Sequence, residues 1–201
     1  MTNSTTTNPT RTNATLEPQR TTAREGLGRL RIALGRWWPA LLAIALAALT
    51  WGIDVTAAGR VLPLLPLLYV IAAVVRRRAA SWPILLVSLL GYLALRQQDA
   101  VDPTIVIVAV AAAVTAVGLL RRDGRRELLL QAAGMVAFTG IAVLGLTLAP
   151  DVARYVLAAG WLAHGVWDLV HLRRHAVVSD SYAQWCGVVD IVMAAELLIG
   201  A

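Results

Sequence analysis

Five side chains near the end of this 201-residue chain have the types and the spacing to bind a metal ion or to exchange protons. His164, Asp168 and His171 follow one another at steps of four and three residues, and Cys186 and Asp190 are four residues apart. On a helix these steps place side chains on one face. Imidazole, carboxylate and thiolate groups bind divalent metals, and histidine also titrates near physiological pH.

Both groups lie in segments that are otherwise apolar enough to span a membrane. A charged side chain at the bilayer centre costs about 2.5–3.5 kcal/mol on insertion scales, so such a residue normally faces a partner, an ion or water. We therefore expect residues 152–172 and 181–201 to form an antiparallel hairpin with these groups facing each other. At about 1.5 Å per residue, Asp168 and Cys186 would lie roughly 5–7 Å deep, and His164 and Asp190 roughly 11–13 Å deep.

One chemistry that these residues fit is a divalent metal site such as zinc. Two ligand pairs one turn apart are open, Asp168 with His171 or His164 with Asp168, each completed by Asp190 or Cys186. The favoured enzyme arrangement has Asp168, His171 and Asp190 as ligands and His164 as an acid–base group. The two histidines are separated by about two helical turns, near 10–11 Å, and would not readily share one ion. Haem is not expected, because all three histidines lie between positions 164 and 175 and a haem held between two spans needs one from each helix.

Three classes of function remain open. A metal-dependent enzyme could be a hydrolase of lipid-like substrates reached from the inner leaflet. A transporter or channel component could use His164, Asp168 and Asp190 as a proton or ion path. A non-catalytic scaffold could use a histidine–aspartate pair only as an interhelical hydrogen bond, worth about 0.6 kcal/mol. The sequence names no reaction or substrate.

Other polar and aromatic residues of the last two segments are expected outside the cluster. Glu196 faces roughly 120° away from Asp190 and lies near the outer boundary, where it would contact water. Tyr182, Trp167 and Trp185 are expected to be packing groups or interface anchors.

Composition places the chain among polytopic membrane proteins. Hydrophobic residues make up 58% of it and charged residues only 15%. Its net charge is +6, and the 18 basic residues behind it are all arginines. Most of them lie in short clusters between apolar runs. This distribution indicates membrane topology and not a nucleic-acid partner.

The expected fold is an all-α bundle of seven transmembrane helices. Residues 1–24 are predicted to be a disordered cytosolic tail, 25–36 a basic juxtamembrane segment that binds anionic lipids, and 37–201 the transmembrane domain. The predicted spans are 37–54, 57–75, 79–95, 101–120, 128–149, 152–172 and 181–201.

The arginines predict the orientation. Fifteen of the eighteen fall in the tail and in alternate connections, and the other three are Arg60, Arg96 and Arg154. By the positive-inside rule the amino terminus is cytosolic and, with seven spans, the carboxyl terminus is outside. All-arginine basic content and abundant alanine, valine and leucine favour a bacterial cytoplasmic membrane. Oligomeric state cannot be inferred.

The last two spans resemble a family of small, uncharacterised bacterial integral membrane proteins. The resemblance is carried by Trp161, His164, the pair Trp167-Asp168 and His171, followed by Cys186 and Asp190. It matches a Gly-Trp-x-x-His-x-x-Trp-Asp-x-x-His-His pattern, with Leu172 standing where the pattern has its second histidine. The resemblance implies that these positions form the site, and it brings no activity with it.

Overall fold

The computed structural model describes residues 35–49, 52–98, 100–121 and 123–200, all helices and short connections without a strand. The all-α class is therefore confirmed. The helices are Gly35–Leu49, α2 (Val55–Val61), α3 (Leu64–Val75), the 3-10 turn η1 (Arg78–Ala80), α4 (Ser81–Leu95), α5 (Pro103–Leu119), α6 (Arg125–Thr147), α7 (Pro150–Arg174) and α8 (Asp180–Ile199). The predicted tail lies outside the described residues, as does the juxtamembrane segment except for its last two residues.

Local chemistry explains where several helices begin. Asp54 accepts a hydrogen bond from the Ala57 amide at the start of α2, and Asp102 accepts one from the Thr104 amide at the start of α5. Ser179 accepts one from the Tyr182 amide and fixes the first turn of α8. Each side-chain oxygen satisfies an amide that has no partner within its own helix.

The second predicted span, 57–75, is divided in two. α2 ends at Val61 and α3 begins at Leu64, with Pro63 between them. Proline has no amide hydrogen to donate and its ring crowds the preceding turn, so the helix breaks there. The two pieces still form one apolar stretch from Val55 to Val75 that is long enough to cross a membrane.

Four segments of the described residues are long and apolar enough to cross a membrane: Val55–Val75, Arg78–Leu95, Arg125–Thr147 and Asp180–Ile199. The helices Gly35–Leu49 and Pro103–Leu119 are apolar but shorter. α7 has 25 residues but carries several charged side chains. The apolar helices indicate a membrane environment, while the count of seven spans and the orientation stay predictions.

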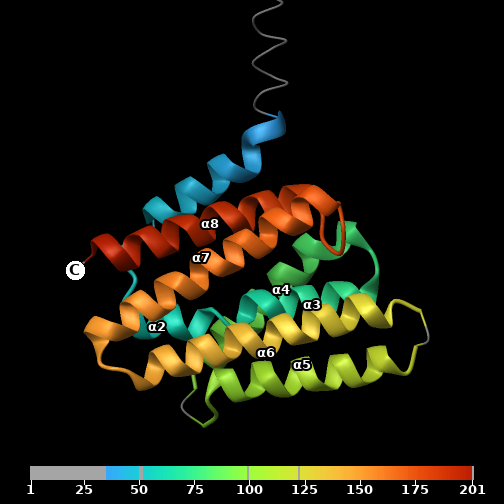
Figure 1. Ribbon diagram of the computed structural model, residues 1–201, viewed down its shortest axis with the longest axis horizontal. Helices are drawn as coiled ribbons and strands as arrows, with labels where there is room; N and C mark the ends of the chain where they lie inside the picture. The colour runs from blue at the N-terminus through green and yellow to red at the C-terminus, as the bar shows by residue number, and fades with distance from the viewer. Residues whose placement is uncertain (1–34, 50–51, 99, 122, 201) are drawn as a thin grey trace, which may run out of the picture. The chain divides into compact units, whose positions relative to one another are not determined.

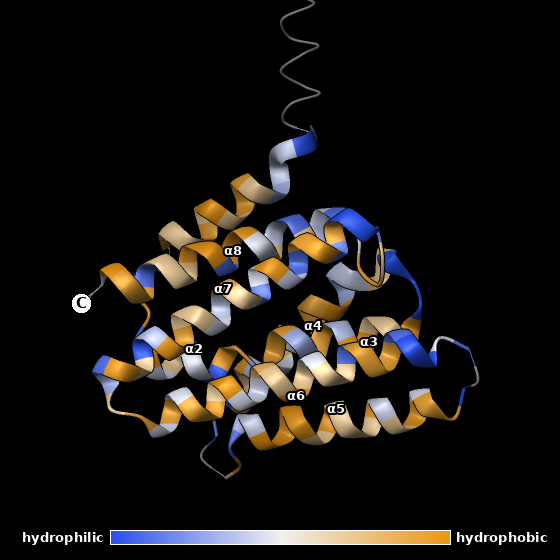
Figure 2. Cartoon of the chain, in the orientation of Figure 1, coloured by the Kyte–Doolittle hydropathy of each residue, from blue (hydrophilic) through white to orange (hydrophobic). Residues whose placement is uncertain are grey.

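The helices from Pro39 onward belong to one compact unit. In it, α7 and α8 run antiparallel and side by side, α6 packs against α7, and α3 packs against α6 (Figure 1). Hydrophilic residues gather at the connections while the helices are largely hydrophobic (Figure 2). Large apolar side chains such as Val87 and Val136 are more than two thirds exposed, as expected of surfaces that face lipid.

Candidate metal centre

α7 and α8 bring four of the five expected side chains together. His164 and Asp168 lie one turn apart on the buried face of α7, and Cys186 and Asp190 lie one turn apart on the facing side of α8. All four side chains are completely buried. One donor atom from each lies within 4.8 Å of the other three, the only such group of metal-binding residue types within the described part of the chain. The predicted hairpin and its convergent polar face are confirmed.

His164 is the centre of the group. Its Nδ1 lies 2.7 Å from Asp190 Oδ2 and 3.5 Å from Asp168 Oδ2, so one imidazole nitrogen faces both carboxylates. The ring edge also contacts Phe138 of α6, with a centroid separation of 4.9 Å. Packing and hydrogen bonding therefore both fix the ring.

Three of the four residues keep a polar atom without a hydrogen-bond partner. These atoms are His164 Nε2, Asp168 Oδ2 and Asp190 Oδ1. Cys186 differs, because its Sγ lies 3.9 Å from the Tyr182 hydroxyl and forms a weak hydrogen bond with it. Buried polar groups are nearly always partnered, so unpartnered atoms on three residues of one buried group indicate that something else binds there.

The charges lead to the same conclusion. Two carboxylates without solvent contact lie beside each other, and a protonated His164 would neutralise only one of them. An uncompensated buried carboxylate costs several kcal/mol. The group therefore needs either additional protons or a divalent cation.

Tyr69 of α3 completes the surroundings, and sequence reasoning missed it. Its hydroxyl donates a hydrogen bond to Asp168 Oδ1, and its side chain is completely buried. Its ring makes edge contacts with His164 and His171, with centroid separations of 5.7 and 4.8 Å. No spacing or motif indicated this role, because a lone tyrosine in an apolar helix equally fits packing or an interface.

His171 lies outside the group of four, although sequence spacing placed it among the metal ligands. Its Nδ1 is 2.9 Å from the Trp167 carbonyl, so it donates there, and its Nε2 accepts from Gln131 Nε2 at 2.9 Å. Gln131 also donates to Glu127 at 2.6 Å. Both ring nitrogens of His171 are thus occupied, and its lone pair is directed at α6 and not at Asp168.

α7 and α8 approach each other closely at the cluster because a glycine of each helix lies there. A Cβ placed on Gly165 would lie 3.2 Å from the Asp190 Cβ, and one on Gly187 would lie 3.4 Å from the Asp168 Cβ. The same glycines form part of an apolar groove of about 220 Å³ on the outer side of the hairpin. The position a Gly187 side chain would fill is 3.8 Å from Asp168 Oδ2. Gly165 and Gly187 are therefore the part of the groove wall that lies against the cluster, while the four cluster residues themselves do not line the groove.

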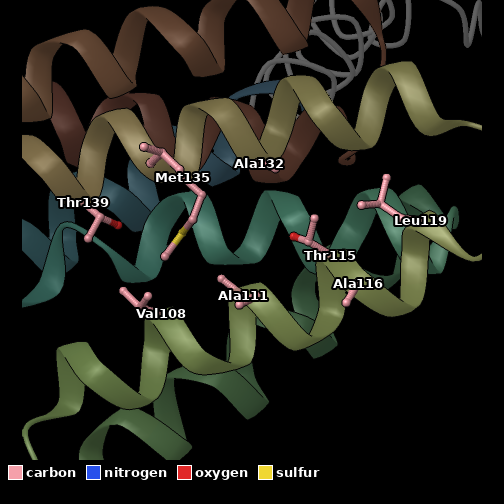
Figure 3. Close-up of a pocket in the computed structure, with 10 residues that line it drawn as sticks. Val108, Ala111, Thr115, Ala116, Leu119, Ala132, Met135 and Thr139 are labelled. Carbon is pink, nitrogen blue, oxygen red and sulfur yellow. The ribbon is translucent and has the colours of Figure 1, made fainter.

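A second apolar cavity, of about 500 Å³, lies between α5 and α6 (Figure 3). Val108, Ala111 and Leu119 line it from α5, and Met135 and Thr139 line it from α6. No residue of the cluster contributes to it. Of these two cavities, the groove beside Gly187 is the one that lies next to the metal-binding residues.

Comparisons with models of known protein families, with curated proteins and with solved structures find no match for this chain. The arguments for function therefore come from the site itself.

Proposed function

We propose that the protein is an integral membrane metalloenzyme that binds one divalent ion, zinc fitting the donors best, between α7 and α8. The observation that carries this proposal is the completely buried set of His164, Asp168 and Asp190, each with an unpartnered polar atom. Zinc binds both histidine nitrogen and aspartate oxygen, and three protein ligands leave a fourth position open. Cys186, whose thiol bonds to Tyr182, is the remaining member of the group.

This assignment exchanges the roles expected from the sequence. His164 becomes a ligand in place of His171, and His171 serves to hold Gln131 and Glu127 on α6. Tyr69 fixes the orientation of Asp168 through its hydroxyl. Partners of this kind, which orient the ligands of a metal, typically change metal affinity 10–100-fold when removed.

The activity that fits this centre is hydrolysis of a lipid-like substrate. A zinc ion in an open site makes a bound water more acidic and polarises a carbonyl or phosphoryl oxygen. Apart from Gln184, the groove beside Gly187 is lined by apolar residues of α7 and α8, which suits an acyl chain entering from the bilayer. The reactive bond of such a substrate would have to pass between α7 and α8 at Gly165 and Gly187, so the two helices must separate there for it to reach Asp168 and the metal.

Elemental analysis tests the metal. Full-length protein purified after zinc loading should hold about one zinc per chain, and Asp168→Asn and Asp190→Asn should abolish binding. His171→Gln and the exposed Asp123→Asn are matched controls that should retain it. Wild-type protein that takes up no zinc would refute the metal centre.

Hydrolysis is tested separately in proteoliposomes with fluorogenic lipids that carry an ester, an amide or a phosphodiester. The zinc-loaded wild type should cleave one of them, and Asp190→Asn should not. Protein that holds zinc but cleaves none of the three would refute the hydrolase and leave a structural metal that ties α7 to α8.

A proton path is the second candidate, favoured by one observation. Glu127, which is about one third exposed, bonds to buried Gln131 and through it to His171. The chain of hydrogen bonds then stops, because His171 and Tyr69 meet only through their rings. Proton flux into liposomes that is lost in both Gln131→Leu and Asp168→Asn would favour this function, and flux that survives both would exclude it.

A further inference from the structure

A polar pocket lies at the end of the unit where α7 begins and α8 ends. It has a volume of about 310 Å³. It is lined by the connection before α2, the first turn of α7 and the last turn of α8: Gly52, Ile53, Asp54, Val55, Pro150, Asp151, Arg154, Glu196, Leu197 and Gly200. Glu196 lies roughly 9 Å farther along α8 than Asp190, so this pocket is separate from the metal centre.

Glu196 is the unexplained residue of this pocket. The sequence predicted that it contacts water, but it is only 5% exposed. Neither of its carboxylate oxygens has a hydrogen-bond partner among the described residues. A carboxylate in this position loses its hydration without gaining a partner, which is costly unless a ligand supplies one.

Arg154 lines the same pocket without pairing with an acid. None of the ion pairs of the described residues joins it to Glu196, Asp54 or Asp151. Its guanidinium lies 4.9 Å from the Tyr155 ring centre and donates to the Tyr155 hydroxyl, while its Nε is buried without a partner. One arginine and three acids thus line this pocket, and Arg154 and Glu196 both keep unused hydrogen-bonding atoms.

The two helix ends strengthen this separation of charge. α7 begins here with Ala149 and Pro150 and has no side-chain cap, so its first amides favour an anion beside Arg154, although the acidic Asp151 stands in the same turn. α8 ends here, and its last carbonyl groups give the pocket a negative end beside Glu196. One side of the pocket therefore favours an anion and the other a cation.

A single metal ion does not fit this arrangement. Metal ligands must lie within about 2.6 Å of one ion, and the carboxylates of this pocket do not converge in that way, unlike the group around His164. The complement of the pocket is a small molecule that carries both charges on a short linker.

We propose that this pocket binds a primary ammonium joined to a phosphate, the chemistry shared by the head group of phosphatidylethanolamine and free phosphoethanolamine. The ammonium donates to Glu196 and lies near the carbonyl end of α8. The phosphate accepts from Arg154 and lies near the amino end of α7.

The test uses the full-length protein and two probes. Soluble phosphoethanolamine is titrated into detergent-purified protein, and phosphatidylethanolamine is offered in nanodiscs against phosphatidylcholine and phosphatidylglycerol. Binding is followed by calorimetry and by the midpoint of thermal unfolding, which a ligand specific for the folded state raises. Binding of the soluble probe identifies a free molecule as the source, and stabilisation only by the ethanolamine lipid identifies the head group.

Variants decide whether this pocket is responsible. Glu196→Gln and Arg154→Gln should each weaken binding of the effective probe by at least about tenfold, because each removes a charge-assisted hydrogen bond. Asp123→Asn, an exposed acid at the opposite end, should bind as the wild type does. Equal binding by all three variants, or no response of the wild type to either probe, would overturn the proposal. Glu196→Gln keeps the shape of a side chain that has no partner to lose, so it should fold at least as well as the wild type.

Discussion

Asp168 is the residue at which three helices meet. It projects from α7, accepts from Tyr69 of α3 and lies against Gly187 of α8. Replacing Tyr69 by phenylalanine removes the hydroxyl and keeps the ring contacts. We expect zinc affinity to fall about 10–100-fold in Tyr69→Phe, as measured by competition with a chelator of known affinity.

Tyr92→Phe is the matched control for that change. Tyr92 is buried, and its hydroxyl has no hydrogen-bond partner within the described residues. Its removal should leave zinc affinity unchanged. Equal affinities in the two variants would show that the Tyr69 hydroxyl does not orient a ligand.

The thiol of Cys186 is expected to stay outside the metal's ligand set because it already bonds to Tyr182. Cobalt(II) is a spectroscopic probe of this question, since a cobalt–thiolate bond gives intense near-ultraviolet absorption. We expect that band to be absent from the cobalt-loaded wild type and the metal content of Cys186→Ser to equal that of the wild type. An intense band would instead indicate a closed four-ligand site.

Sequence periodicity predicted part of this site for a clear reason. His164, Asp168, Cys186 and Asp190 converge because their spacing and the antiparallel hairpin are both local properties of the last two segments. His171 shares the helix face but contacts Gln131, a residue forty positions earlier. Helical spacing fixes direction around one axis and not which neighbouring helix supplies a partner, so contacts with α3 and α6 could not be foreseen.

Among elements, the α7–α8 crossing depends on glycine. A methyl group on Gly165 would press against the Asp190 Cβ at 3.2 Å, whereas one on Gly140 of α6 would meet nothing within 4 Å. We expect Gly165→Ala to destabilise the protein by about 1–3 kcal/mol through overpacking. Gly140→Ala should stabilise it by about 0.5–1 kcal/mol by reducing the freedom of the unfolded chain. Denaturant unfolding in detergent measures both.

If Gly165→Ala proves as stable as Gly140→Ala, the two helices are not held at contact distance by that glycine. Zinc content of the same variants provides an independent check, because separating α7 from α8 also separates Asp168 from Asp190. Loss of zinc in Gly165→Ala alone would place the effect at the crossing.

The apolar runs and the residues that bound them predicted the positions of the helices closely. Each predicted span contains a helix, and Pro103 and Pro150 mark helix starts as residues in the first turn should. The break at Pro63 was not predicted. It was missed because the run from 57 to 75 is apolar apart from Arg60, and hydropathy does not register one missing amide hydrogen.

At the scale of the whole molecule, metal binding should couple to stability. If the ion binds only the folded chain, zinc at 100 times its dissociation constant adds about 2.7 kcal/mol. We therefore expect zinc to raise the melting temperature of the wild type and a strong chelator to reverse the rise. Asp190→Asn should show neither effect, and a rise of equal size in that variant would assign the stabilisation to another site.

Topology has its own test, because the chain contains a single cysteine. In a Cys186→Ser background, Asp123→Cys and Gln98→Cys provide one reporter in each of two successive connections. The predicted orientation requires a membrane-impermeant maleimide to label position 98 in intact cells and position 123 only after lysis. Labelling of both positions from the same side would show that α5 does not cross.

The order of the donors along the chain has a consequence for biogenesis. Tyr69 lies in α3, whereas His164, Asp168 and Asp190 all follow α6. Since a ribosome delivers the amino-terminal helices first, the pocket wall is in place before any ligand emerges. Metal loading is then a late step of assembly, and a chain arrested during synthesis before α8 would carry its tyrosine but capture no ion.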